Sequence, residues 1–201
     1  FSVVHNGIIE NSDEIKISLI KKSHKFNSET DSEVIAHLLE HFSKKHNKLN
    51  DVLINTFKTI KGSFALGIIY EKEPDKIIVA SNGSPLLIGL GKNVNYISSD
   101  IQALSSKTKK YVPLEDNEFA IITNKSSQLY NNKGIKINRL PLVTKQNIKT
   151  ISKNGYKHFM QKEIFEQKDI IARVIKDRLG AEKILPNIFG PKSDAMLKSI
   201  K

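Results

Sequence analysis

The 201-residue sequence contains no cysteine and no tryptophan, and only three of its 32 basic residues are arginine. Without cysteine, the chain has no disulfide framework, no zinc finger and no thiol nucleophile of its own. No run approaches the roughly 18 consecutive apolar residues of a membrane-spanning helix, and the first residues do not form a signal-peptide pattern. An apolar content of 39% is enough for a folded core. We therefore expect a soluble globular protein that does not associate with membranes.

The net charge of +11 invites a nucleic-acid interpretation, but the residue types oppose it. All of the excess positive charge lies after residue 100. Base readout and bidentate phosphate contacts favour arginine, whereas almost all of these cations are lysine. Aromatic residues make up 7% of the chain and do not alternate with the basic stretch as in a stacking surface. We expect a lysine-rich solvated surface and no nucleic-acid partner.

The first third of the chain predicts one strand followed by helices. Patterns typical of capping boxes stand at Asn11–Glu14 and at Thr30–Glu33. After the second of these, apolar residues recur at three- and four-residue spacing from Val34 to Phe42. A glycine, Gly62, is expected to cap the last helix of the group. The predicted elements are a strand at 2–9 and helices from about 12 to 22, 33 to 43 and 50 to 61.

The middle of the chain predicts a series of short strands separated by turn residues. The strands are rich in isoleucine, valine, leucine and tyrosine, and their short connections favour antiparallel pairing. They are expected at 63–70, 76–80, 86–90, 94–98, 119–123, 128–130 and 135–138. Helices grouped before a strand meander indicate an α+β fold with helices packed on a sheet.

The chain divides near a polar, lysine-rich connector. We expect a folded domain over residues 1–140, a linker over 141–157, and a helical segment that begins near His158 and runs to about Leu179. The residues from 158 to 201 contain too few apolar side chains for a second core, so they predict the start of a larger domain.

His5-Asn6-Gly7 follows an apolar run and has two interpretations. Asn-Gly between apolar segments is a strong hairpin pattern, which predicts a type I′ turn at Asn6 and Gly7. Alternatively, the Asn6 amide and the Gly7 N–H group could stabilise an oxyanion. The sequence by itself favours the hairpin.

Asp31 precedes the most strongly periodic helix and also has two interpretations. An acidic residue at a helix N-terminus is stabilised by the helix dipole, and this effect is sufficient to explain an aspartate at this position. A carboxylate at this position could instead hold the ammonium group of a substrate. The residues alone favour the capping role.

His37-Leu-Leu-Glu40-His41 matches the H-x-x-E-H pattern of inverted zincin proteases, and Glu118 lies where a third ligand would be sought. A pattern that fixes only three residues often occurs by chance, and Glu118 begins a predicted strand instead of lying on a helix. We therefore interpret His37 and His41 as flanking residues of a half-buried helix, and we expect no metal.

Several segments, in order along nearly the whole chain, resemble the family of glutamine–fructose-6-phosphate aminotransferases, also called glucosamine-6-phosphate synthases. Five segments resemble its glutaminase domain and a sixth, HFMQKEIFEQ, its entry into the isomerase domain. Lys168 departs from the family, in which proline usually follows this stretch. The similar segments are VVHNGIIEN at 3–11, SETDSEVIAHLL at 28–39, KGSFALGII at 61–69, SNGSPLLIGLG at 81–91, YISSDIQAL at 96–104 and HFMQKEIFEQ at 158–167.

This resemblance implies an incomplete αββα sandwich of the N-terminal-nucleophile hydrolase type, followed by a linker and a helical segment. In the family an N-terminal cysteine attacks the glutamine amide, and ammonia passes to a sugar-phosphate site. By resemblance, Asn6 and Gly7 form the oxyanion hole, and Asp31 holds the amino group of glutamine. The substrates implied are glutamine and, in a full-length enzyme, fructose 6-phosphate, with no cofactor.

The resemblance also implies a cytoplasmic homodimer for the full-length enzyme. Because the chain begins on Phe1 and holds no cysteine, we expect a fragment that is inactive by itself. Two other interpretations stay open: another class II glutamine amidotransferase, such as amidophosphoribosyltransferase, or a non-catalytic glutamine-binding regulator.

Overall fold

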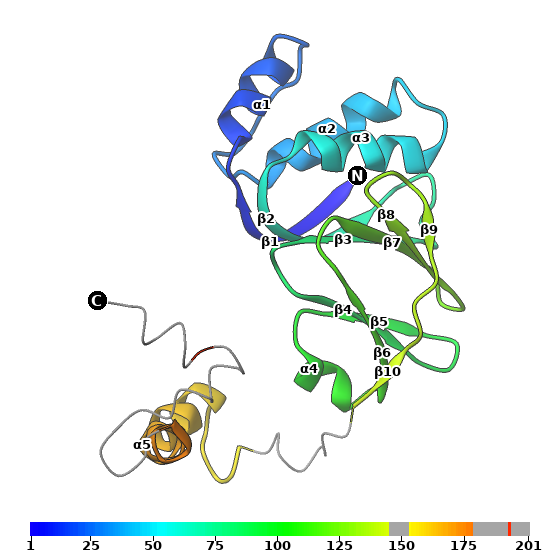
Figure 1. Cartoon of the computed structure of the whole chain (residues 1–201). Helices are drawn as coiled ribbons and strands as arrows, with labels where there is room; N and C mark the ends of the chain where they lie inside the picture. Colours follow the sequence, from blue (N-terminus) through cyan, green and yellow to red (C-terminus); the bar gives the residue numbers. More distant parts are fainter. Residues whose placement is uncertain (145–152, 179–192, 194–201) are drawn as a thin grey trace. The chain divides into compact units, whose positions relative to one another are not determined.

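The computed structural model describes residues 1–144, 153–178 and 193, and the chain divides into two compact units, Phe1–Thr150 and Ile151–Lys201 (Figure 1). The expected glutaminase part, 1–140, lies within the first unit. Of the expected linker, residues 145–152 are outside the described residues. So is the end of the chain beyond Arg178, apart from Ser193.

The first unit has the predicted order of helices and strands, with three additions. Eight of its strands and its three longer helices lie within about two residues of their predicted bounds. Two short strands, β6 and β10, and the one-turn helix α4 were not predicted. The elements are β1 (Ser2–Ile9), α1 (Ser12–Ile20), α2 (Glu33–Ser43), α3 (Leu49–Thr59), β2 (Gly62–Ile69), β3 (Ile77–Asn82), β4 (Leu86–Leu90), β5 (Asn95–Ser98), α4 (Ile101–Ser105), β6 (Lys110–Leu114), β7 (Glu118–Ile122), β8 (Ser127–Asn131), β9 (Lys136–Ile137) and β10 (Leu142–Val143).

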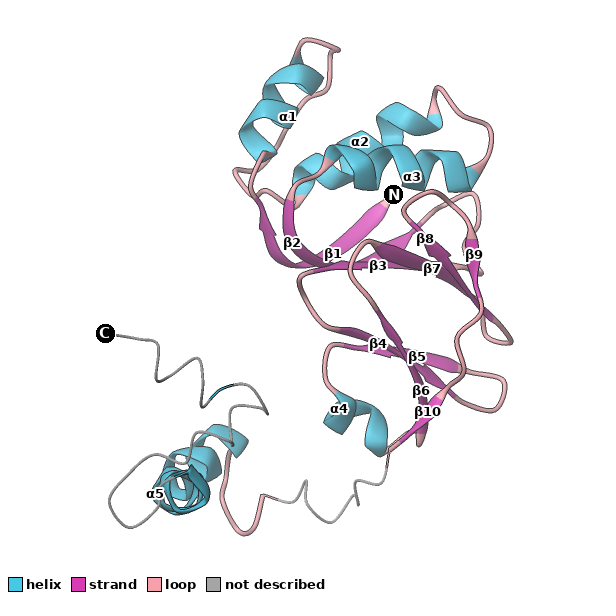
Figure 2. Ribbon diagram, viewed as in Figure 1, coloured by secondary structure: helices cyan, strands magenta, loops and turns pink. Residues whose placement is uncertain are grey.

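The strands form two antiparallel sheets that lie against each other. One sheet has six strands in the order β1-β2-β3-β7-β8-β9, and the other has four in the order β10-β6-β4-β5. The longer helices α1, α2 and α3 lie on the side of the six-stranded sheet away from the smaller sheet (Figure 2). α4 packs against β5. This arrangement confirms the α+β prediction and leaves β1 at the edge of the larger sheet.

The six-stranded sheet is the central layer because its inner strands bury side chains on both faces. Leu66 on β2 and Ile78 on β3 belong to the core beneath the helices, whereas Ala65 and Val79 belong to the core between the sheets. On α2, the predicted apolar face is buried against the first of these cores. Its buried residues are Val34, Ile35, Leu38 and Leu39.

Neither predicted capping box forms. The Asn11 side chain instead reaches the end of α3 and its connection to β2: its Oδ1 accepts from the Lys61 N–H at 2.8 Å, and its Nδ2 donates to the Thr59 carbonyl at 2.9 Å. Glu33 accepts from the backbone N–H groups of Asn27 and Ser28 instead of returning to its own helix N-terminus. In both places a contact with another segment replaces the local capping bond.

An ion pair between Arg139 and Glu118 joins the strands near the end of the first unit. The guanidinium donates to both carboxylate oxygens at 2.7 and 2.8 Å and also to the Pro113 carbonyl on β6. The Glu118 side chain is only 8% exposed. Hydrogen bonding to Glu118 raises the pKa of Arg139. Since Glu118 lies on β7 and Pro113 on β6, the pair connects the two sheets.

The described residues of the second unit lie mainly in α5, which spans Phe159–Arg178. The Tyr156 ring stacks on that of Phe165 with 5.6 Å between centroids. α5 continues through Lys168, so lysine at this position is compatible with an uninterrupted helix. Within the part of the chain that the structure describes, no helix combines the length and apolarity needed to cross a membrane.

We expect Arg139→Ala to lower the free energy of unfolding by about 3 kcal/mol, because it leaves the Glu118 carboxylate buried without its partner. Urea denaturation of the chain measures the effect. Lys136→Ala, which removes an exposed cation from the neighbouring strand β9, is the control and should change stability by less than about 0.5 kcal/mol. Equal stability of the two variants would contradict the structural role of the ion pair.

Candidate functional site

His5, Asn6 and Gly7 lie in the middle of β1 and form no turn. β1 pairs with β2 without interruption from Ser2 opposite Ile69 to Ile9 opposite Gly62. The hairpin interpretation is therefore wrong for the described structure. The pairing partner that keeps this Asn-Gly segment extended lies more than fifty residues further along the chain, where a local pattern cannot report it.

The backbone of Gly7 approaches β2 so closely that a side chain would not fit. Gly7 has φ +135°, and a Cβ atom placed there would lie 2.1 Å from the Ser63 carbonyl oxygen. Gly62, expected as a helix cap, has the same role on the opposite strand: it begins β2 with φ +119°, and its Cβ would lie 2.2 Å from the Ile8 carbonyl oxygen. The pair of glycines allows the two strands to meet at this end.

Asp31 lies beside the outer edge of β1. Its Oδ2 accepts from the Ile9 N–H at 2.8 Å, and its Oδ1 is 3.8 Å from Nδ1 of His5. The Ser32 hydroxyl lies 2.9 Å from the same His5 nitrogen. The His5 side chain is 2% exposed, and among the described residues its Nε2 has no hydrogen-bond partner. The structure thus brings the predicted Asp31 next to the strand that carries Asn6 and Gly7.

A cavity of about 490 Å³ opens on the other face of the same strand, between β1 and the smaller sheet. Val4 and Asn6 line it from β1, and Ile97 and Ser98 line it from β5. Asn6 is exposed, and no hydrogen bond of its amide is found within the described part of the chain. The side-chain amide of Asn6 is therefore available to a ligand.

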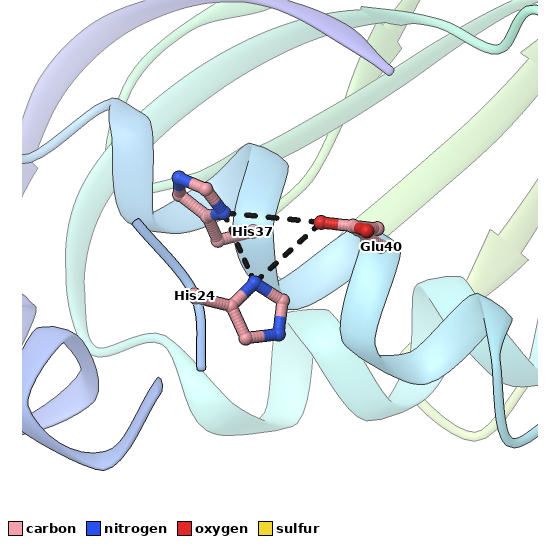
Figure 3. Close-up of side chains that lie close together, drawn as sticks. All are labelled: His24, His37 and Glu40. Atoms are coloured by element: carbon pink, nitrogen blue, oxygen red, sulfur yellow. Dashed lines mark hydrogen bonds and ion pairs between the residues drawn. The ribbon is translucent and has the colours of Figure 1, made fainter. Parts of the chain in front are cut away.

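The residues of the H-x-x-E-H pattern separate in the structure. His37 and Glu40 meet His24, which comes from the segment after α1, and the three side chains converge (Figure 3). Nε2 of His41 is 3.5 Å from the Lys22 ammonium group. The His41 ring meets that of His24 edge-on, with 5.9 Å between centroids, but it supplies no atom to the cluster. Glu118 is held by Arg139 on the strands. The protease-like set of His37, His41 and Glu118 is therefore not assembled.

The charged groups around this cluster have altered pKa values. Burial lowers the pKa of His24 and of His41, which favours neutral imidazoles. Hydrogen bonds, first from the Ser28 hydroxyl and then from backbone N–H groups, lower the pKa of Glu33 to about 2. A hydrogen bond from Lys44 lowers the pKa of Glu40. Both carboxylates are thus ionised at neutral pH.

A family model described as a glutamine amidotransferase domain matches residues 1–106, which is more than half of the chain. The chain belongs to this family. The expected family membership is thereby confirmed, and the HNG and SETD segments both lie inside the matched region.

The amidotransferase chain is similar to three curated glutamine–fructose-6-phosphate aminotransferases [isomerizing]. The protein of Aquifex aeolicus is 41% identical over 92% of this chain, that of Clostridium acetobutylicum 38% over 90%, and that of Pseudomonas putida 36% over 100%. These alignments cover 31%, 29% and 33% of the respective relatives. The chain therefore spans about a third of the length of the curated relatives it matches.

Two solved structures resemble the amidotransferase unit. Glutamine phosphoribosylpyrophosphate amidotransferase from B. subtilis, complexed with ADP and GMP, has a TM-score of 0.58 and 27% identity, covering 65% of this chain and 28% of its own. A second structure, described as the allosteric regulatory enzyme of purine biosynthesis, has a TM-score of 0.56 and 26% identity over the same shares. With the two sheets and their helical layer, this likeness confirms the N-terminal-nucleophile hydrolase type of fold.

Two histidines that contact the candidate site residues of the amidotransferase domain were not predicted from the sequence. His5 was not singled out, although it stands beside Asn6, and its contact with Ser32 joins β1 to the start of α2. His24 was not singled out because it lies outside any helix pattern. No local spacing in the sequence indicates either residue, since each meets its partners only in the folded chain.

We expect Gly7→Ala to lower the free energy of unfolding by about 3 kcal/mol or more, because the new methyl group meets backbone atoms of β2. Gly134→Ala is the matched control. Gly134 also has a positive φ, +78°, but its Cβ would meet only the end of the flexible Ile54 side chain. That change should cost about 1–2 kcal/mol. Equal losses in urea denaturation would show that the close approach of β1 and β2 is unimportant.

Proposed function

We propose that this chain supplies part of the glutamine-hydrolysing site of a glutamine–fructose-6-phosphate aminotransferase. The observation that carries the proposal is the placement of Asn6, Gly7 and Asp31 around one strand, which fits the roles implied by the resemblance. Similarity to the aminotransferases extends over 90–100% of the chain, whereas the solved amidotransferases cover 65% of it. This difference favours the aminotransferase over another class II amidotransferase.

Asn6 and Gly7 are proposed to stabilise the oxyanion that forms when the glutamine amide is attacked. Successive N–H groups of a strand point to opposite sides. The Glu10 N–H donates to Lys61 on the β2 side, and the Ile9 N–H donates to Asp31 on the other side. The same alternation directs the Gly7 N–H outward, where a ligand can reach it. The exposed Asn6 amide is a second donor.

Asp31 is proposed to bind the ammonium group of glutamine. The Ile9 N–H holds Oδ2 in place, and the side chain keeps 29% of its surface exposed. The N–H groups of Gly7 and Ile9 are separated by about 7 Å, two residues along a strand. An extended glutamine spans a comparable distance between its amide oxygen and its α-amino nitrogen. One end of the substrate could therefore meet Gly7 while the other meets Asp31.

The remaining parts of the proposal come from the resemblance. The 201 residues contain no cysteine, so a cysteine nucleophile would have to come from polypeptide outside them, and this chain by itself should not turn over glutamine. Residues 1–140 are assigned to the glutaminase domain, 141–157 to a linker and 158–201 to the start of the isomerase domain. Fructose 6-phosphate as acceptor, a homodimer and a cytoplasmic location are proposed for the whole protein.

Asn6→Ala tests the proposed site in the protein expressed from its complete reading frame. Losing one oxyanion donor should lower the kcat for glutamine hydrolysis by about 100- to 1,000-fold, with little change in stability. Asn47→Ala, an exposed asparagine between α2 and α3, is the matched control and should leave the rate unchanged. A wild-type rate for Asn6→Ala would overturn the oxyanion assignment, and a protein without glutaminase activity would overturn the proposed function.

A further inference from the structure

Three potential metal ligands from two segments converge in the first unit (Figure 3). Nδ1 of His24 is 3.1 Å from Nδ1 of His37, and Oε2 of Glu40 is 3.5 Å from the first and 3.9 Å from the second. We propose that these three atoms bind one zinc ion, with the fourth coordination position left to water. This inference is independent of the proposed glutamine site.

The distances between the ligand atoms match those of a zinc site. Zinc binds imidazole nitrogen and carboxylate oxygen at about 2.0–2.2 Å in tetrahedral geometry, so two of its ligand atoms lie about 3.4 Å apart. The three observed separations fall on both sides of this value. Sites with three protein ligands and one open position are a known zinc arrangement.

The types of ligand disfavour the hard cations magnesium and calcium. Magnesium and calcium prefer oxygen ligands, and two of the three atoms here are imidazole nitrogens. Imidazole suits zinc and its late transition-metal neighbours. Zinc, which has no geometric preference arising from d electrons, accommodates the unequal separations most easily.

The backbone fixes His24 toward α2 before any ion binds. α1 ends in a Schellman motif: the His24 N–H donates to the Leu19 carbonyl at 3.1 Å, and the Ser23 N–H donates to the Ile20 carbonyl at 2.9 Å. Ser23 adopts φ +68°, the left-handed conformation that this motif requires. The His24 side chain, only 6% exposed, is thus buried against His37.

Glu33 orients His37 in the manner of a carboxylate–histidine–zinc arrangement. Its Oε1 lies 3.5 Å from Nε2 of His37, on the side of the ring away from His24. A carboxylate there favours the tautomer with the proton on Nε2, which leaves the Nδ1 lone pair free for a metal. Hydrogen bonds from Asn27 and Ser28 hold Glu33 itself.

Glu40 divides its two oxygens between different partners. Lys44 lies 2.6 Å from Oε1, which leaves Oε2 facing the two imidazoles as a monodentate ligand. Lys22 contacts His41 and does not contact the three ligands. The positive side chains nearby reduce the affinity for a cation, but they occupy none of the proposed ligand atoms.

Zinc titration of the 201-residue chain, after treatment with a chelator, tests the site by calorimetry. Binding of cobalt(II) provides a second readout, since tetrahedral cobalt has visible absorption bands. We expect one ion per chain. His24→Ala and Glu40→Gln should each weaken zinc binding by at least tenfold, and Glu33→Gln should weaken it by about 10- to 100-fold through His37.

His41→Ala is the matched control, because His41 belongs to the H-x-x-E-H pattern but not to the proposed site. It should bind zinc as the wild type does. Glu40 is 48% exposed, so Glu40→Gln is expected to fold even if His24→Ala does not. The proposal is overturned if the wild-type chain binds no zinc stoichiometrically, if Glu40→Gln binds it unchanged, or if His41→Ala loses it. Glutaminase activity enters none of these measurements.

Discussion

The close approach of β1 to β2 at Gly7 and Gly62 is the constraint on which the proposed glutamine site depends. At both positions a side chain would overlap a carbonyl oxygen of the opposite strand, so only glycine permits the observed register. That register determines which N–H groups of β1 face outward and places the Ile9 N–H on Asp31. Asn11, bonded to Lys61 and Thr59, then closes the end of the strand pair.

The elements that could be predicted are those in which the residues that form the local sequence pattern are also the residues that pack in the core. The apolar face of α2 was visible because Val34, Leu38 and their neighbours pack on the sheet at helical spacing. What could not be predicted depends on residues distant in sequence. Asn-Gly in β1 stays extended because β2 pairs with it. The side-chain oxygens of Asn11 and Glu33 accept hydrogen bonds from other segments instead of capping helices. β6 was missed because Pro113 interrupts its pattern.

The same distinction applies to two clusters of polar residues. One is formed by Asn6, Gly7 and Asp31, and the other by His24, His37 and Glu40. Asn6, Gly7 and Asp31 were found through resemblance, since the residues alone favoured a hairpin and a cap. The H-x-x-E-H pattern identified His37 and Glu40 but paired them with His41, the neighbour on the same helix. The actual neighbour is His24, thirteen residues before His37, and the end of α1 brings it there. Helical spacing shows which side chains share a face but not what that face meets.

α2 connects these clusters while keeping them chemically separate. Its residues Glu33, His37 and Glu40 fall on one stripe, because positions three and four apart on a helix share a face. The apolar stripe beside them packs on the sheet, and Asp31 precedes the helix at the edge of β1. A zinc ion on the polar stripe would join α2 to the segment after α1, away from the atoms that Asp31 contacts. Ion binding would therefore stabilise the helical layer without occupying the proposed glutamine site.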